Sequence, residues 1–196
     1  MGSRGIAVSY EAVRTWVARF GMQFAAKIRR GRPKPIDKWH LDEVVTPING
    51  AIHWLWRAVD ANGDVLDILV QSRRNKAAAA RFFRKLFKRW GVPRVVITDK
   101  LRSYGAAKAE IAPGLEHRQH KGLNNRAEAS HRHTRRQQKV MGRFKSPGHA
   151  QRFLSVHDQT AALFRPKHYL LSANSYRHAR ADAFALWAEY TADLTV

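Results

Sequence analysis

Cysteine is absent from the 196 residues, methionine occurs only three times, and acidic residues are scarce, with 15 Asp and Glu against 36 Lys and Arg. The missing cysteine excludes a disulfide scaffold, thiol catalysis and Cys-ligated zinc, and it fits a reducing compartment. A run of about 18 apolar residues and an apolar signal core are also missing, so we expect a cytoplasmic protein with no membrane partner.

What the chain does contain is positive charge and aromatic residues. The net charge of +21 indicates a polyanionic partner. The excess of basic over acidic side chains is +6 in residues 1–37, +6 in 38–116, +9 in 117–152 and 0 in 153–196. We therefore expect the nucleic-acid surface mainly in the first and third segments. With 44% hydrophobic residues, six Trp and nine Phe, the chain has enough material for one buried core.

The hydrophobic periodicity predicts an α/β fold in the order β-β-β-α-β-α-β-α, followed by further helices. Period-two patterns and short apolar runs predict strands at 39–45, 51–59, 65–70, 95–97 and 116–119. Spacings of three and four predict helices at 9–30, 75–90, 103–112, 124–140, 148–164 and 174–194. Turns are expected at 47–50 and 60–64. Because a helix precedes strand 95–97, this strand should lie parallel to an earlier one.

The N-terminal helix follows a short segment, Gly5 to Ser9, that resembles the turn of a helix-turn-helix. Arg14 and Arg19 would then face outward as DNA contacts. Too few residues precede Ser9 for the first helix of such a motif, so the module is predicted to be partial. A plain packing helix explains the pattern equally well.

Two aspartates are candidates for a shared metal site. Asp42 lies midway along the first predicted strand and Asp99 at the end of the fourth, so the two side chains converge if these strands are neighbours. Glu43 points to the opposite face of its strand. Two Mg²⁺ ions about 3.5–4 Å apart can activate the attacking oxygen and stabilise the leaving oxygen of a phosphodiester. Taken singly, Asp99 could equally be a turn residue and Asp42 a lysine partner.

A third carboxylate, Glu128, stands alone among ten Lys and Arg in residues 117–152. Such a basic setting suits an acid that works beside bound phosphates. A surface ion pair is the alternative explanation. The histidines at 117, 120, 131 and 133 are interpreted as phosphate contacts or solvent-exposed rings rather than zinc ligands, because 131 and 133 diverge on a helix.

Five motifs resemble, in order, those of bacterial insertion-sequence transposases of the DDE class, with family six as the nearest group. They are Lys38-Trp-His-Leu-Asp-Glu43, Trp54-Leu-Trp-Arg-Ala-Val-Asp60, Ile97-Thr-Asp-Lys100, Glu116-His-Arg-Gln119 and Asn124-Asn-Arg-Ala-Glu128. The resemblance covers nearly the whole chain from about Gly5. It implies an RNase H-like fold with a mixed five-stranded sheet, an integrase-type catalytic core.

The same resemblance implies that Asp42, Asp99 and Glu128 form the catalytic, metal-binding triad. It implies Mg²⁺-dependent DNA strand cleavage and strand transfer with two ions, for which Mn²⁺ can substitute. DNA partners would be terminal inverted repeats and target DNA, and the chain would act as a homodimer or larger assembly near the bacterial nucleoid. The stretch from Asp99 to Glu128 is shorter than in many relatives.

A basic residue seven positions after the Glu is also implied, and here it is Arg135, two helical turns from Glu128. A solvated arginine is the alternative. Further candidates for DNA contact are chosen for their charge near the proposed triad: Lys100, Lys121, Arg126, Arg132 and Arg136.

The predicted organisation has four parts. They are a partial helix-turn-helix at 1–30, a basic linker at 31–37, the RNase H-like core at 38–145, and C-terminal helices packed on the core at 146–196. The leading hypothesis is an active transposase. The alternatives are a truncated, catalytically inactive transposase that binds DNA or inhibits, and a nuclease of the same fold acting on RNA–DNA hybrids.

Overall fold

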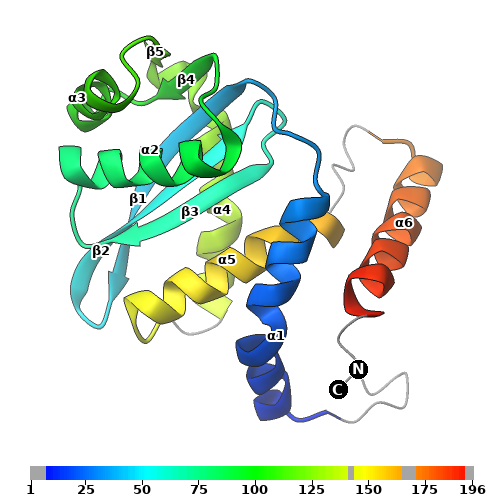
Figure 1. The fold of residues 1–196 in the computed structure, drawn as a ribbon. Coiled ribbons are helices and arrows are strands. Elements are labelled where there is room, and N and C mark those ends of the chain that lie inside the picture. The colour runs from blue at the N-terminus through cyan, green and yellow to red at the C-terminus, as the bar shows by residue number, and fades with distance from the viewer. Residues whose placement is uncertain (1–7, 141–143, 165–170, 193–196) are drawn as a thin grey trace. The chain divides into compact units, whose positions relative to one another are not determined.

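Five strands form one mixed sheet with the order β3-β2-β1-β4-β5 (Figure 1). This computed structural model describes residues 8–140, 144–164 and 171–192. The strands are β1 (Lys38–Ile48), β2 (Ala51–Asp60), β3 (Val65–Gln71), β4 (Val95–Thr98) and β5 (Glu116–Gln119). β1, β2 and β3 are antiparallel, whereas β4 runs parallel to β1 and β5 parallel to β4. The predicted mixed five-stranded sheet is confirmed.

The first hairpin is tighter than the sequence analysis predicted. β1 continues to Ile48, Pro47 pairs with Ile52, and the turn consists of Asn49 and Gly50, whose φ angles are 49° and 75°. An Asn-Gly pair with two positive φ angles suits the twist of a two-residue hairpin. β4 pairs only with the first residues of β1, Lys38 to His40. At Pro47 one side of β1 is therefore unpaired with β4, as in an edge strand, and proline is tolerated there. The turn predicted to start at Pro47 was therefore wrong by two residues.

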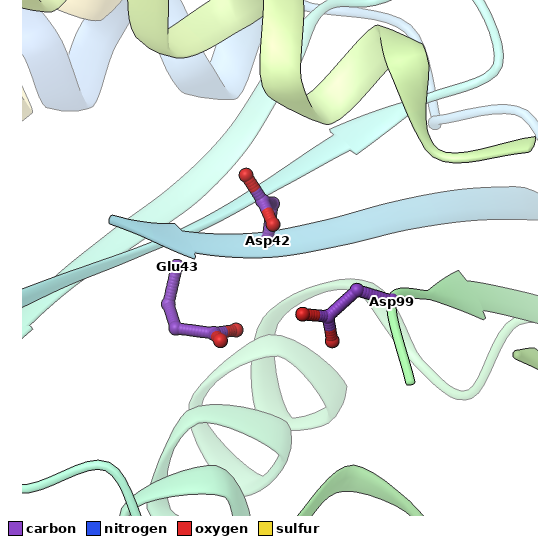
Figure 2. A group of neighbouring side chains, drawn as sticks. All are labelled: Asp42, Glu43 and Asp99. Atoms are coloured by element: carbon purple, nitrogen blue, oxygen red, sulfur yellow. The ribbon is translucent and has the colours of Figure 1, made fainter. Parts of the chain in front are cut away.

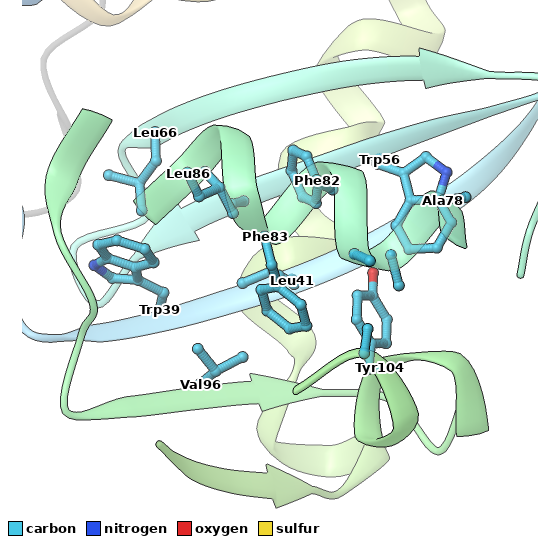
Figure 3. Close-up of a cluster of buried hydrophobic side chains, with 14 of the residues drawn as sticks. Trp39, Leu41, Trp56, Leu66, Ala78, Phe82, Phe83, Leu86, Val96 and Tyr104 are labelled. Carbon is cyan, nitrogen blue, oxygen red and sulfur yellow. The ribbon is translucent and has the colours of Figure 1, made fainter. Parts of the chain in front are cut away.

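One face of the sheet carries the larger core, which α2 (Lys76–Trp90) and α3 (Arg102–Ile111) complete. Figure 3 shows Phe82, Phe83 and Leu86 of α2 packed over Trp39 and other side chains of the sheet. Asn75 caps α2 by accepting from the Ala78 amide, and Gly91 ends it with a positive φ. Truncating one of these buried phenylalanines to alanine would cost about 3–5 kcal/mol.

The opposite face carries α4 (Asn125–Val140), which contacts β1 and β2 (Figure 1). A second apolar cluster lies on this face, where Leu55 and Ile68 of the sheet meet Phe144, Ala150 and Leu154. Ala150 and Leu154 belong to the beginning of α5 (Pro147–Phe164). The two faces of β1 and β2 therefore bury different side chains, and His131 of α4 lies over Asp42.

Contacts divide the chain into two units, Pro33–Leu154 and the combination of Met1–Arg32 with Ser155–Val196. In the second unit, α1 (Tyr10–Gly31) contacts α6 (Ala173–Ala192). The rings of Phe24 and Trp187 are 4.9 Å apart, and Lys27 donates to the Tyr190 carbonyl at 3.1 Å. The predicted domain boundaries, including the packing of 146–196 on the core, stay predictions.

α1 begins as predicted, since the Ser9 hydroxyl accepts from the Ala12 amide at 3.1 Å. Residues 1–7 lie outside the described part of the chain, so the partial helix-turn-helix stays a prediction. Among the helices that the structure describes, none has both the length and the apolar composition needed to cross a bilayer.

Candidate metal centre

Asp42, midway along β1, meets Asp99, which directly follows the end of the neighbouring parallel strand β4. Trp39 pairs with Val96 and His40 with Ile97, and the same register two residues further sets Asp42 opposite Asp99. Oxygens of Asp42, Asp99 and Glu43 all lie within 4.8 Å of one another (Figure 2). The predicted convergence of the two aspartates is thus a feature of this sheet.

The carboxylate of Asp42 is buried beneath α4, with only 11% of its side chain exposed. Its Oδ2 lies 3.4 Å from Nε2 of His131. Burial raises the pKa of Asp42 to about 7, and repulsion by Glu43, Asp99 and Glu128 adds to this rise. An aspartate held in this way is energetically unfavourable in its ionised form unless a cation approaches it.

α4 is fixed on the sheet by two buried polar side chains. Asn124, just before the helix, donates to the Leu41 carbonyl at 2.8 Å, one residue before Asp42. Arg57, which is only 2% exposed, donates to the Ser130 carbonyl at 3.1 Å and to the Thr134 hydroxyl. These bonds set the position of α4 over Asp42.

Glu128 lies on α4 three residues before His131, which is close to one helical turn. It is exposed, and it is outside the group whose oxygens meet within 4.8 Å. Its charge nevertheless contributes to the raised pKa of Asp42. Glu128 is therefore near enough to Asp42 for its charge to act there, while its place in the triad stays a prediction.

Glu43 is a member of this site that the sequence analysis missed. Its side chain leaves the opposite face of β1, as alternation predicts, but extends toward Asp99 (Figure 2). There it accepts from the Tyr104 hydroxyl at 2.6 Å and from Nε of Arg74 at 2.7 Å. Burial raises the pKa of Glu43, while Tyr104 and Arg74 oppose the rise. Strand alternation predicts on which face of β1 the Glu43 side chain begins, but it does not predict how far the long glutamate side chain extends toward Asp99.

The predicted DNA contacts lie on the surface wherever their side chains are described. Arg14 pairs with Glu11 at 2.6 Å. Arg135 is exposed, and its charge lowers the pKa of His131, whose largest cause of lowering is burial. Also exposed are Arg19, Lys100, Arg126, Arg132 and Arg136. The side chain of Lys121 lies outside the described part.

Two of the four histidines do not behave as predicted. His131 is 2% exposed and lies against Asp42, so its interpretation as a phosphate contact or solvent-exposed ring was wrong. Nε2 of His117 lies 2.8 Å from the Thr98 hydroxyl, and burial lowers its pKa. His120 is exposed as expected, and the side chain of His133 lies outside the described part.

Comparison with solved structures agrees with this fold. The HTLV-2 integrase catalytic core domain, solved in complex with magnesium in a trimeric form, aligns with a TM-score of 0.51 at 12% identity. The alignment covers 70% of this chain and 94% of that one. The fold is RNase H-like, the fold of integrase catalytic cores.

The family profile of the DDE domain of IS240-type transposases matches residues 36–167. The chain belongs to the DDE-class insertion-sequence transposases, within family six. Two Staphylococcus aureus transposases, those of IS431mec (strain Mu50) and of IS257 in transposon Tn4003, are each 33% identical to it over 135 residues. These matches cover 66% of this chain, which spans 60% of the length of the relatives.

Proposed function

We propose that this chain is the catalytic part of an insertion-sequence transposase that cleaves DNA strands and transfers them to a target in a Mg²⁺-dependent reaction. Asp42, Asp99 and Glu128 are its catalytic residues and its metal ligands. The observation that carries the proposal is the meeting of Asp42, midway along β1, with Asp99, just after the parallel strand β4, with oxygens within 4.8 Å.

The residues present fit a divalent cation. All donors are carboxylate oxygens, the ligands that Mg²⁺ prefers, and Mn²⁺ can occupy similar sites. Mutual repulsion helps to raise the pKa of Asp42 to about 7, and this repulsion is what a cation would relieve. Two ions bound here would activate the attacking oxygen and stabilise the leaving oxygen of a phosphodiester.

The chain's own groups have distinct tasks in this proposal. Asp42 and Asp99 supply ligand oxygens from the sheet, and Glu128 supplies one from α4. Arg135, two turns after Glu128, holds a phosphate beside the site. Arg57 and Asn124 keep α4 at the distance from β1 that the site requires.

The proposed substrates are the terminal inverted repeats of the element and a target duplex. The exposed arginines of α4 and the exposed Arg14 and Arg19 of α1 supply sequence-independent attraction for the phosphates. Because strand transfer needs two ends held together, the proposed active form is a homodimer or a larger assembly.

The test is cleavage of a supercoiled plasmid that carries the ends of the element encoding this chain, followed on gels with Mg²⁺ or Mn²⁺. Wild type should nick the plasmid at the ends, whereas Asp42→Asn, Asp99→Asn and Glu128→Gln should each be reduced at least about a hundredfold. If wild type and Asp99→Asn cleave equally fast, the proposed catalytic role of Asp42, Asp99 and Glu128 is rejected. If the protein binds the DNA in a salt-sensitive way but does not cleave it, even with Mn²⁺, the result favours the alternative of an inactive DNA-binding or inhibitory protein. Preference for an RNA–DNA hybrid over the duplex would indicate a nuclease.

A further inference from the structure

The carboxylate of Glu43 is fully buried and already engaged on both oxygens. Its side chain is 0% exposed. Oε1 accepts from Arg74, with 2.7 Å to Nε and 2.5 Å to Nη2, and Oε2 accepts from the Tyr104 hydroxyl at 2.6 Å. Three donors therefore point at a carboxylate that has an oxygen near enough to Asp42 and Asp99 to share a cation with them.

The Arg74 guanidinium is held on three sides. Besides the two bonds to Glu43, its Cζ lies 4.9 Å from the centroid of the Trp54 ring, and its Nη2 lies 3.5 Å from Oδ2 of Asp99. About a third of the side chain, 35%, stays exposed. An arginine ordered by a carboxylate and an aromatic face loses little further conformational freedom when an anion binds.

The position of Arg74 matters because of the charge around it. Asp42, Glu43 and Asp99 form a negative cluster at the place where a DNA phosphate has to approach. A guanidinium beside Asp99 offsets that repulsion, and Nη1, which is not among the atoms bonded to Glu43, can donate to a phosphate oxygen.

We propose that Arg74 is a phosphate-binding residue of the catalytic site, and that Glu43 and Tyr104 are positioning residues that hold Arg74 rather than ligands of a metal ion. The proposal rests on the transposase function proposed above. It assigns to Glu43 a role that its distances to Asp42 and Asp99 alone would not suggest. Arg74 binds the DNA backbone next to the bond that is cut, and Glu43, through its bonds to Nε and Nη2, fixes the guanidinium in place beside Asp99.

The experiment compares Arg74→Gln, Arg74→Lys, Glu43→Gln and Tyr104→Phe with wild type in the full chain. Arg84→Gln is the matched control, because Arg84 is an exposed arginine of α2 paired with Glu110. Three quantities are measured: the single-turnover rate of plasmid cleavage, the Mn²⁺ dissociation constant from the electron paramagnetic resonance of free Mn²⁺, and the salt dependence of DNA affinity. Circular dichroism melting confirms that each variant folds.

For cleavage, Arg74→Gln and Glu43→Gln should each lower the rate by about tenfold to a hundredfold at saturating DNA and Mg²⁺. Arg74→Lys should keep part of the activity, because it retains the charge but not the fork. Tyr104→Phe should show a smaller loss of the same kind. Glu43→Gln removes one negative charge, so a purely electrostatic account predicts tighter DNA binding and no slower cleavage. A Glu43→Gln variant as fast as wild type would overturn the proposal.

For metal binding, Glu43→Gln should leave the Mn²⁺ dissociation constant within about threefold of wild type, whereas Asp99→Asn should weaken it by about tenfold or more. Equal weakening by Glu43→Gln and Asp99→Asn would make Glu43 a ligand and overturn the proposal.

DNA affinity provides a readout that does not need turnover. In Ca²⁺, which binds oxygen ligands but differs from Mg²⁺ in geometry, Arg74→Gln should reduce the slope of log K against log salt by about 0.9, the share of one phosphate contact. Arg84→Gln should keep the wild-type slope. An unchanged slope for Arg74→Gln would reject Arg74 as a phosphate contact. Should wild type fail to cleave DNA, the transposase proposal fails, while this slope still decides the role of Arg74.

Discussion

Arg57 stands directly opposite Asp42 in the β1–β2 ladder, and its guanidinium is turned to α4 rather than to solvent. One buried cation thus lies beside the acidic site and at the same time holds the helix that carries Glu128 and His131. Its charge also contributes to the lowered pKa of His131, after the larger effect of burial. The position of α4 over Asp42 therefore depends on a strand residue outside the proposed triad.

Replacing Arg57 by alanine should lower the free energy of unfolding by about 2–4 kcal/mol, because a buried charged donor and two helix acceptors lose their bonds. Urea denaturation followed by circular dichroism measures this change. The control is Arg94→Ala, since Arg94 is 63% exposed and its ion pairs are 3.8 and 3.9 Å long. We expect the control to change stability by less than about 0.5 kcal/mol. Similar losses for both variants would contradict the anchoring role of Arg57.

Asp42→Asn should stabilise the metal-free protein at neutral pH. The folded state holds the Asp42 proton up to a pKa of about 7, whereas the unfolded state releases it near 3.8. Because the folded state binds more protons between these values, the stability of wild type falls as pH rises through this window. Asparagine removes the effect, so its gain over wild type should grow from near zero at pH 4 to on the order of 2–4 kcal/mol at pH 8.

The measurement is the difference between the two melting curves at each pH in EDTA. The difference is needed because His131 acts in the opposite direction: its lowered pKa makes stability rise with pH up to the ordinary value of 6.5. Asp182→Asn, at an exposed position away from the acidic site, serves as the control. A constant difference between Asp42→Asn and wild type from pH 4 to 8 would show that Asp42 ionises normally.

Divalent cations should stabilise wild type without any DNA present. A ligand that binds only the folded state adds about 2.7 kcal/mol at a hundred times its dissociation constant. We therefore expect Mn²⁺ to raise the melting temperature of wild type and to have little effect on Asp42→Asn or Asp99→Asn. Differential scanning calorimetry at pH 7.5, with Na⁺ at equal ionic strength as the control, measures the shift. A rise of the same size in all three proteins would place the bound cation elsewhere.

Much of this architecture could be predicted from the sequence because its signals are local. The period-two pattern in 39–45, the Asn-Gly pair at 62–63 and the apolar spacing in 75–90 each fix an element from nearby residues. The intervening helix predicted that β4 lies parallel to an earlier strand; in the structure that strand is β1, and this pairing brings Asp42 to Asp99.

The polar environment of the site could not be predicted in the same way. Arg57 with Thr134, and Glu43 with Arg74 and Tyr104, are contacts between residues 31 to 77 positions apart, which no local period encodes. Strand alternation assigned Glu43 to the opposite face of β1, and only the length of its side chain brings it back toward Asp99. His131 was interpreted as a phosphate contact or a solvent-exposed ring, yet the ring is buried between α4 and the sheet, against Asp42.

The exposed arginines of α4 should act in DNA binding through their phosphate contacts. Arg135 is the sharpest case, because it is exposed and close enough to His131 for its charge to lower the pKa of that buried ring. Arg135→Ala should reduce the slope of log K against log salt by about 0.9 for any duplex sequence, since a phosphate contact carries no base information. Fluorescence anisotropy of a labelled duplex from 50 to about 300 mM NaCl measures the slope. Arg84→Gln, on the opposite face of the sheet, should leave it unchanged, and equal slopes for all three proteins would exclude Arg135 from the DNA interface.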